Sequence, residues 1–191
     1  MSKKFALISS ILAGNTKVCE FALTNVCTAK CKFCSIWEQK PKHMVDTDTA
    51  LKTIDHLSRL GVRFITLTGG EPLIHPDFDK IVAECSRHKV ISAILNADAR
   101  LLTEERLDAL KQARVDIVCI SVDHHTDEIA SMSRSIPGIM GHIEKAVEGL
   151  KKRGITSMAS TLICNYNHHT LDELFTKCTE MGFDQITVNY P

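Results

Sequence analysis

The sequence contains no apolar run that approaches the roughly 20 residues needed to cross a membrane. It also lacks a net charge, because 23 lysines and arginines balance 23 aspartates and glutamates. Broad nucleic-acid binding depends mainly on neutralising phosphates, so this balance disfavours nucleic acids and charged membrane surfaces as partners. Internal repeats, low-complexity tracts and Pro/Gly/Ser-rich linkers are absent as well. With 191 residues, 44% hydrophobic and 24% charged, the chain has the composition of one ordinary globular domain.

The N-terminal segment differs from the rest of the chain. Lys3 and Lys4 precede an apolar stretch over residues 5–13, which has the outline of a short secretion signal. Ser9 and Ser10 interrupt that stretch, and the residues that follow form a poor cleavage site. We therefore interpret residues 1–17 as an amphipathic N-terminal extension and residues 18–191 as the core domain.

Six short runs rich in β-forming residues alternate with amphipathic helical patterns after residue 17. The helical patterns lie over residues 51–60, 76–85, 103–113, 143–153 and 170–181. The repeating units have the length of βαβ motifs, which predicts parallel strands joined by right-handed crossovers. The predicted strands are Val18–Leu23, Arg63–Leu67, Val90–Leu95, Val115–Ile120, Ile155–Ile163 and Gln185–Val188.

Polar residues follow every predicted strand after the first. Parallel α/β folds place their functional sites at these C-terminal strand ends. A flat sheet concentrates its site at one switch point, whereas a barrel collects side chains from all of its strands. The spread of polar residues therefore favours a sheet that curls toward a barrel. These residues are Thr68–Glu71, Asn96, Ser121, Asp123, Asn165 and Asn189.

Three of the eight cysteines, Cys27, Cys31 and Cys34, lie within eight positions, a clustering that packing does not explain. In a cytosolic chain such a cluster is more typical of metal binding or catalysis than of disulfides. A cubane iron–sulfur cluster held by three cysteines would leave one iron open to a substrate or cofactor, since such clusters normally have four cysteine ligands. A structural zinc site is the main alternative, with His43 or Cys19 as a fourth ligand. The spacing C-x3-C-x2-C does not match the paired C-x-x-C knuckles of most zinc sites.

This loop, with Phe33 just before its third cysteine, resembles the signature of the radical S-adenosylmethionine (SAM) superfamily. The turn Gly69-Gly70-Glu71-Pro72 resembles a second hallmark of that family, and the resemblance covers nearly the whole chain. It implies an α/β fold, a partial (β/α)6 TIM-like barrel with parallel strands. It also implies that Cys27, Cys31 and Cys34 bind a [4Fe–4S] cluster whose open iron binds SAM. The reduced cluster would cleave SAM to methionine and a 5′-deoxyadenosyl radical, which abstracts hydrogen from a substrate or adenosylates it.

The glycine turn also makes sense physically. Gly69 and Gly70 let the backbone approach a ligand closely, and Glu71 can accept a charge-assisted hydrogen bond from an ammonium group. A surface turn is the plainer interpretation of these residues taken alone. The resemblance implies that the turn, including Pro72, meets the amino group of SAM.

The resemblance implies further SAM contacts from other strands. Ser121 and Asp123 resemble a motif that contacts the methionine or ribose part, and Arg134 lies where some members place a carboxylate-binding arginine. Phe33 is expected beside the adenine, with simple loop packing as the alternative. We expect Asn96, unless it caps a turn, and Asn189 to reach the same ligand.

The other cysteines and a histidine pair receive plainer interpretations. Cys85, Cys119 and Cys178 fall on apolar faces and are predicted to be small buried hydrophobic residues. Neither Cys19 nor Cys164 is assigned a role, although Cys164 at a strand end could face the active space. His124 and His125 are also assigned none, because adjacent histidines at a strand end are more often solvated than part of a substrate space. A second cysteine cluster, typical of members with auxiliary iron–sulfur domains, is absent from the sequence.

The sequence therefore predicts a cytoplasmic radical SAM enzyme that uses a [4Fe–4S] cluster and SAM. Its motifs resemble stand-alone members of the adenosylhopane synthase type and of the tetrapyrrole- and peptide-maturation types. Expected partners are an electron donor of the flavodoxin or ferredoxin type and a small-molecule, lipid or peptide substrate. A non-catalytic iron–sulfur or zinc protein is one alternative. An ordinary α/β-barrel lyase or phosphate-handling enzyme is another, but no strand end supplies a phosphate loop or an obvious catalytic lysine.

The sequence stops directly after the sixth predicted strand, so no helix follows to cover that strand. We expect the chain to be truncated after this strand, with much of the substrate specificity in the absent part. We also expect the exposed edge at Gln185–Val188 to favour self-association.

Overall fold

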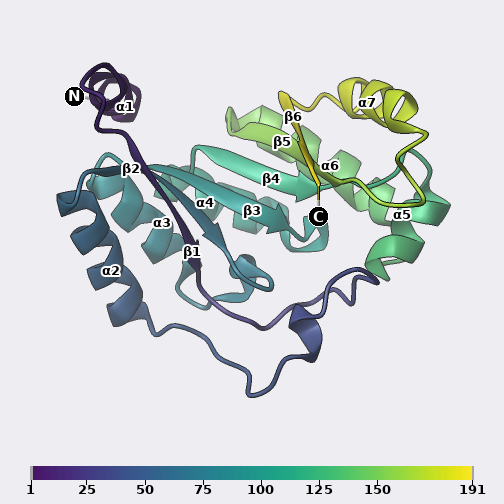
Figure 1. Ribbon diagram of the computed structural model, residues 1–191, viewed down its shortest axis with the longest axis horizontal. Coiled ribbons are helices and arrows are strands. Elements are labelled where there is room, and N and C mark those ends of the chain that lie inside the picture. The colour runs from purple at the N-terminus through teal and green to yellow at the C-terminus, as the bar shows by residue number, and fades with distance from the viewer. Residues whose placement is uncertain (1, 191) are drawn as a thin grey trace.

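A computed structural model describes residues 2–190, apart from the side chain of Asn96. Six strands form one sheet in the order β1-β2-β3-β4-β5-β6, and every neighbouring pair is parallel. The sheet curls into a half-barrel (Figure 1), which confirms the predicted α/β partial barrel with parallel strands. The strands are β1 Lys17–Ala22, β2 Val62–Thr68, β3 Ile91–Ala97, β4 Ile117–Ser121, β5 Thr156–Leu162 and β6 Gln185–Asn189. Each overlaps the strand predicted for it.

Helices connect the strands, and neighbouring helices of the series α2, α3, α4 and α6 pack against one another along one face of the sheet. The helices are α1 Lys3–Leu12, α2 Thr47–Arg59, α3 Phe78–Arg87, α4 Glu104–Ala113, α5 Asp127–Arg134, α6 Ile139–Arg153 and α7 Leu171–Glu180. Short 3-10 turns follow β1, β2 and β3 at Ile36–Glu38, Pro72–Ile74 and Ala99–Leu101. The helix α5 was not predicted, because only Ala130 and Ser133 are buried on it and it has no large apolar face.

The C-terminal ends of the helices agree closely with the sequence patterns, whereas α2 begins at Thr47 and α6 at Ile139, earlier than the patterns over 51–60 and 143–153. Thr103 caps α4 by accepting a hydrogen bond from the Arg106 amide, and Gly154 ends α6 at a positive φ. Thr170 precedes α7 without capping it, because its side chain donates to the Asn167 carbonyl and makes no cap hydrogen bond to the helix. Helix α3 begins at Phe78 rather than at Pro76.

The core lies between the sheet and these helices. Ile65 and Ile94 from the strands and Phe78, Leu110 and Ile143 from the helices have no solvent exposure. Burial of such side chains is the main stabilising contribution, at about 1.5–3 kcal/mol for each.

Two of the scattered cysteines, Cys85 and Cys178, belong to this core, and Cys119 on β4 is buried outside it. Cys85, Cys119 and Cys178 are buried, as predicted. Burial raises the pKa of the Cys85 thiol to about 12 and those of Cys119 and Cys178 to about 11, so all three are protonated at neutral pH.

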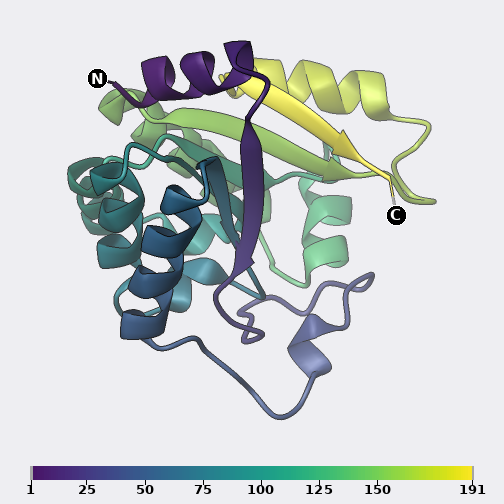
Figure 2. The ribbon, with the colours of Figure 1, turned by 60° about the vertical axis from the view of Figure 1, so that its left-hand side comes forward.

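The segment from residue 23 to 46 leaves the C-terminal end of β1 and passes along the mouth of the half-barrel before α2 (Figures 1 and 2). It contains the three clustered cysteines. Within the described residues, no helix is both long and apolar enough to cross a membrane.

Candidate active site

The cysteine loop is attached to the sheet at both of its ends. Leu23 donates from its amide to the Thr68 carbonyl at 2.8 Å, and Val45 donates back to the Leu23 carbonyl at 2.9 Å. An antiparallel bridge joins Thr24 to Met44. These bonds fix the two chain segments that lead into and out of the loop. The middle part of the loop is therefore held over the C-terminal ends of the β-strands.

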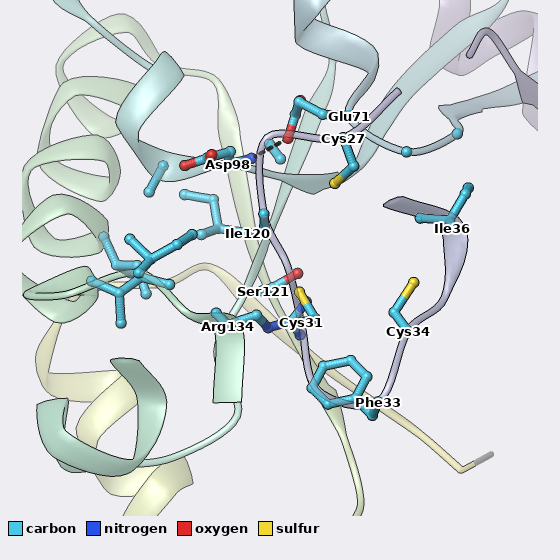
Figure 3. A pocket seen from close by; sticks show the side chains of 18 residues that line it. Cys27, Cys31, Phe33, Cys34, Ile36, Glu71, Asp98, Ile120, Ser121 and Arg134 are labelled. Atoms are coloured by element: carbon cyan, nitrogen blue, oxygen red, sulfur yellow. Dashed lines mark hydrogen bonds between the residues drawn. The ribbon is translucent and has the colours of Figure 1, made fainter. Parts of the chain in front are cut away.

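The three loop cysteines surround one space. Cys31 is buried, Cys27 is half-buried and Cys34 is exposed, and all three line a single cavity at the C-terminal ends of the strands. Their sulfur atoms face the same open region (Figure 3). The expected convergence of Cys27, Cys31 and Cys34 on one site is therefore present in the fold.

The turn after β2 holds this loop in place. The Gly70 amide donates to the Thr24 carbonyl at 2.7 Å, and the Glu71 amide donates to the Val26 carbonyl at 2.8 Å. A Cβ atom on Gly69 would lie 2.3 Å from the Thr24 oxygen, and one on Gly70 would lie 2.2 Å from the Val26 oxygen. Both glycines line the cavity, but the approach that requires them is to the chain's own cysteine loop. We predicted that these glycines allow the backbone to approach a ligand closely. The structure shows that they are needed mainly for the close approach to the backbone of Thr24 and Val26.

Glu71 is a buried carboxylate with two backbone partners. Its side chain accepts from the Leu73 amide at 2.9 Å and from the Asp98 amide at 2.7 Å, and the residue is 2% exposed. Burial raises the pKa of Glu71 to about 7, against the lowering effect of these two amides. The carboxylate thus connects the turn after β2 to the end of β3 while it lines the cavity.

Asp98 extends the connection from Glu71 to the cysteine loop, and the sequence did not indicate it as a site residue. Its carboxylate accepts from Thr28 Oγ1 at 2.7 Å and from Arg100 Nη2 at 2.7 Å. Thr28 directly follows the first cysteine, so Asp98 attaches the cysteine loop to β3. Hydrogen bonds from Arg100 and Thr28 hold the pKa of Asp98 below its usual range in spite of its burial. An aspartate after a strand is indistinguishable from an ordinary turn residue in one sequence.

Arg134 lies on the other side of the cavity. Its Nε lies 2.6 Å from Oδ2 of Asp123, and its Nη1 lies 3.7 Å from Sγ of Cys31. The guanidinium carbon is 4.8 Å from the centre of the Phe33 ring. Arg134 therefore contacts two members of the cysteine loop as well as the end of β4, and it lines the cavity (Figure 3).

Some predicted site residues do not line the cavity. Asp123 is buried behind Arg134, and its Oδ1 accepts from the Leu162 amide at 3.2 Å. Its carboxylate therefore makes its hydrogen bonds to other groups of the protein interior. Pro72 is buried in the turn after Glu71, and Asn189 donates from its side chain to Ser160 Oγ at 3.1 Å. The expected direct SAM contacts of Asp123, Pro72 and Asn189 are thus not supported by their positions. The side chain of Asn96 lies outside the described part of the chain.

The remaining predicted residues do line the cavity, which is closed by apolar side chains that the sequence did not single out. Phe33 and Ser121 line it together with the residues above. Isoleucines from β4, α6 and the preceding segment form its wall: Ile120, Ile136, Ile139 and Ile143. These four are indistinguishable from core residues by pattern alone.

The histidine pair was expected to be solvated, and that is wrong for His124. It is 3% exposed, its Nδ1 lies 2.9 Å from Thr126 Oγ1, and its ring stacks on His125 with centroids 4.3 Å apart. Burial, reinforced by the neighbouring His125 and His169, lowers the pKa of His124. Neither histidine lines the cysteine cavity.

Comparison with known families decides the broad assignment. The profile of the Radical SAM superfamily matches residues 21–178, which is most of the chain. This chain belongs to the radical SAM superfamily. The resemblance seen in the cysteine loop and in the glycine turn is confirmed.

Among curated relatives, the radical SAM domain is 25% identical over 168 residues to the PqqA peptide cyclase of Gluconobacter oxydans, covering 87% of this chain and 47% of that protein. It is 27% identical over 162 residues to the AdoMet-dependent heme synthase of Methanosarcina barkeri, covering 84% of this chain and 46% of that protein. The chain thus spans about half the length of the curated relatives it matches.

Solved structures show the same fold. Streptococcus suis SuiB bound to S-adenosylmethionine superimposes with a TM-score of 0.81 at 15% identity, over 96% of this chain and 44% of that one. The structure of anSMEcpe with bound AdoMet and a Kp18Cys peptide gives a TM-score of 0.75 at 14% identity, over 91% and 51%.

The radical SAM family uses a [4Fe–4S] cluster and SAM, and the residues of this cavity fit both. Among the described residues, no three His, Cys, Asp or Glu side chains converge closely enough to hold a single metal ion. The ligands of a cubane cluster lie farther apart than those of a single ion, because each thiolate binds a different iron. The three thiolates need only surround a common space. Burial raises the pKa of Cys27 and of Cys31, while Arg134 lowers the pKa of Cys31 and so favours its thiolate form. The ammonium and carboxylate of SAM match Glu71 and Arg134 in charge.

Proposed function

We propose that this chain carries the catalytic core of a radical SAM enzyme. It would hold a [4Fe–4S] cluster on Cys27, Cys31 and Cys34 and bind SAM in the cavity that these cysteines share with Glu71 and Arg134. The observation that carries the proposal is that three thiols, a buried carboxylate and a guanidinium line one cavity at the mouth of the half-barrel. When bound, the reduced cluster and SAM supply a 5′-deoxyadenosyl radical for hydrogen abstraction or adenosylation.

The chain's own residues would bind and orient SAM through charge and shape. Glu71 has lone pairs beyond those used by its two amide partners, so it can accept from the ammonium of SAM. Arg134 keeps donors beyond its Nε bond to Asp123, and these can meet the SAM carboxylate. Asp123 then acts indirectly, because it fixes the position of Arg134.

The apolar part of the cavity suits the adenosyl group and keeps water away from the reacting atoms. Phe33 would pack beside the adenine, and Ile120 and Ile143 of the isoleucine wall line the same cavity. Apolar surroundings also protect a reactive species from side reactions with solvent. The protein's contribution is therefore binding, orientation and exclusion of water.

We infer that the substrate approaches through a neighbouring hollow. Phe33 borders both the cysteine cavity and a hollow formed by Leu162, Cys164, Tyr166 and Tyr190 at the ends of β5 and β6. Peptide-modifying proteins occur among the relatives, as the name of the PqqA peptide cyclase indicates, and heme synthases also occur. A peptide or a cofactor precursor is therefore the substrate class we favour over a lipid.

The proposed cluster needs an electron donor, for which we propose a flavodoxin or ferredoxin. An oxygen-sensitive cluster and eight free cysteines suit a reducing compartment, so we place the protein in the cytoplasm.

Anaerobic reconstitution with iron and sulfide tests the proposed cluster. We expect a brown protein with about four irons and four sulfides per chain, as a cubane contains. A colourless protein that binds one zinc ion through the same cysteines would contradict the proposal. Single-turnover assays with peptide and tetrapyrrole panels would then distinguish the two substrate classes.

A further inference from the structure

The first helix is amphipathic, and its apolar face points away from the protein. On α1 the small residue Ala6 is buried against the body. Phe5, Ile8, Ile11 and Leu12 are 58%, 54%, 55% and 83% exposed. At 100° per residue, Phe5, Ile8 and Leu12 share one side of the helix. Large apolar side chains that gather on one exposed face indicate an interaction surface.

The helix lies at the end of the molecule opposite the cysteine cavity. It contacts β2 and β3 and leads into the first residue of β1, so it sits at the N-terminal ends of the strands. Figures 1 and 2 show α1 at the edge of the structure in two views, away from the cysteine loop. Its apolar face is therefore separate from the candidate active site.

Positive side chains gather beside the beginning of this helix. Lys3 donates to the Arg114 carbonyl and to Asp116 Oδ2, both at 2.7 Å, and thereby anchors α1 to the segment before β4. One surface hollow brings together Lys3, Arg87, Lys89, Lys111 and Arg114, with Asp116 as its acidic member.

Most of this charge is not neutralised within the protein. Arg87 pairs with Glu84, and Lys3 with Asp116. Lys89, Lys111 and Arg114 form no ion pair with any described residue, and neither does Lys4 on α1 itself. The zero net charge of the whole chain thus conceals a local positive surface beside the beginning of α1.

The backbone at two of these positions would favour glycine. Lys89 and Arg114 follow α3 and α4 with φ values of 60° and 62°, whereas Gly154 and Gly182 occupy positive-φ positions after α6 and α7. A non-glycine residue is unfavourable in this conformation. The two cations therefore occupy positions where glycine would relieve strain, and both line the hollow that contains Lys3 of α1.

We propose that α1 and these cations form a docking surface for an anionic membrane. In this arrangement α1 lies in the plane of the lipid headgroups with Phe5, Ile8 and Leu12 inserted toward the acyl chains. Lys4, Lys89, Lys111 and Arg114 bind lipid phosphates. Interfacial helices combine an apolar face with flanking cations in this way, and their binding depends on both. The cysteine cavity would then face away from the lipid, so docking localises the protein without presenting lipid as its substrate.

Vesicle flotation of the 191-residue chain tests the proposal without any variant. We expect the protein to float with vesicles of phosphatidylcholine that contain about one quarter phosphatidylglycerol, and to stay behind with phosphatidylcholine alone. Binding should fall sharply in about 0.5 M salt, because screening weakens surface electrostatics. Absence of binding to the anionic vesicles would overturn the proposal.

Two sets of variants separate the apolar and electrostatic contributions. The triple variant Phe5→Ser, Ile8→Ser, Leu12→Ser should weaken binding at least about a hundredfold, since burial of each side chain is lost. Lys89→Gln with Lys111→Gln should weaken it by roughly 30-fold, at about 1 kcal/mol for each lysine. Val188→Ser and the pair Lys40→Gln, Lys145→Gln are matched controls on exposed sites elsewhere, and they should leave binding unchanged.

Sedimentation velocity distinguishes the membrane from a second copy of the chain. We expect the triple serine variant to sediment as the wild-type chain does, because the membrane proposal gives the apolar face of α1 no role in joining two copies. A wild-type dimer that becomes a monomer in that variant would show that the apolar face joins two copies, and the membrane proposal would be wrong. Equal thermal unfolding midpoints confirm that the exposed substitutions leave the fold intact.

Discussion

Nε of Arg134 lies 2.6 Å from Oδ2 of Asp123, a carboxylate whose side chain has no solvent exposure. The same arginine reaches Cys31 and the ring of Phe33. A buried ion pair at the end of β4 thus determines where one side of the cysteine loop lies. In this way the packing of the half-barrel is linked to the geometry of the cluster site.

The ion pair should be sensitive to the loss of its carboxylate. Asp123→Asn leaves the Arg134 cation buried without its partner, which typically costs about 3–5 kcal/mol in the free energy of unfolding. Urea denaturation of the cluster-free chain measures this change. Glu148→Gln is the control, because it breaks an exposed pair with Lys152 and should change stability by less than about 1 kcal/mol. Equal effects of the two substitutions would contradict the structural role of Asp123.

The glycine turn gives a steric prediction. Gly70→Ala places a methyl group against the Val26 carbonyl, so the loop before Cys27 must shift. We expect a loss of about 1–3 kcal/mol in the free energy of unfolding, together with weaker cluster incorporation.

The matched control for this change is Gly141→Ala. Gly141 lies within α6, and nothing lies within 4 Å of its added methyl group. Alanine is the better helix former by about 1 kcal/mol, so this variant should be slightly more stable than the wild type. A Gly70→Ala protein with wild-type stability and iron content would show that the turn does not hold the loop.

The cysteines divide into two groups with different expected behaviour. Replacement of Cys27, Cys31 or Cys34 with Ala should abolish the [4Fe–4S] cluster, since each would remove one of three ligands. Iron and acid-labile sulfide after anaerobic reconstitution are the readout. Cys85→Ala and Cys178→Ala remove buried, protonated thiols and should keep the cluster, although they weaken the core. Full iron content after replacement of any two loop cysteines would refute the ligand assignment.

Glu71 gives the protein a characteristic pH dependence. Because burial raises its pKa to about 7, the folded chain binds more protons at this site than the unfolded chain between about pH 4.5 and 7. Its contribution to stability is therefore largest at low pH and is lost as the pH rises toward 7, by about 3 kcal/mol in all. The measurement is the difference in unfolding free energy between the wild type and Glu71→Gln across this range. A difference that does not change with pH would contradict the buried position of the carboxylate.

Much of the fold could be predicted because its signals are local. β-rich runs alternate with amphipathic helical patterns, so all six strands and most helices were found in the sequence. The half-barrel was indicated by polar residues at strand ends. Helix α5 was missed, because its short buried side consists of small residues such as Ala130 and Ser133.

The site was harder to predict because its contacts join residues distant in sequence. Asp123 and Arg134 were both expected to contact SAM, but they pair with each other, and only Arg134 lines the cavity. Gly70 was expected to approach a ligand, whereas it packs against the backbone of Val26. Asp98 looks like an ordinary turn residue until the fold brings Thr28 next to it. Spacing identifies the residues of such a site but not which of them contact one another.

Reductive cleavage of SAM is the most direct test of the central claim. The reconstituted chain, incubated anaerobically with dithionite and SAM, should form methionine and 5′-deoxyadenosine in equal amounts without added substrate. Glu71→Ala should weaken SAM binding by about tenfold or more, because a charge-assisted hydrogen bond is worth roughly 1.5–3 kcal/mol. The cluster-free Cys31→Ala chain should form no 5′-deoxyadenosine. If the cluster-loaded wild-type chain also fails to form it, the proposed radical SAM chemistry is wrong for this chain.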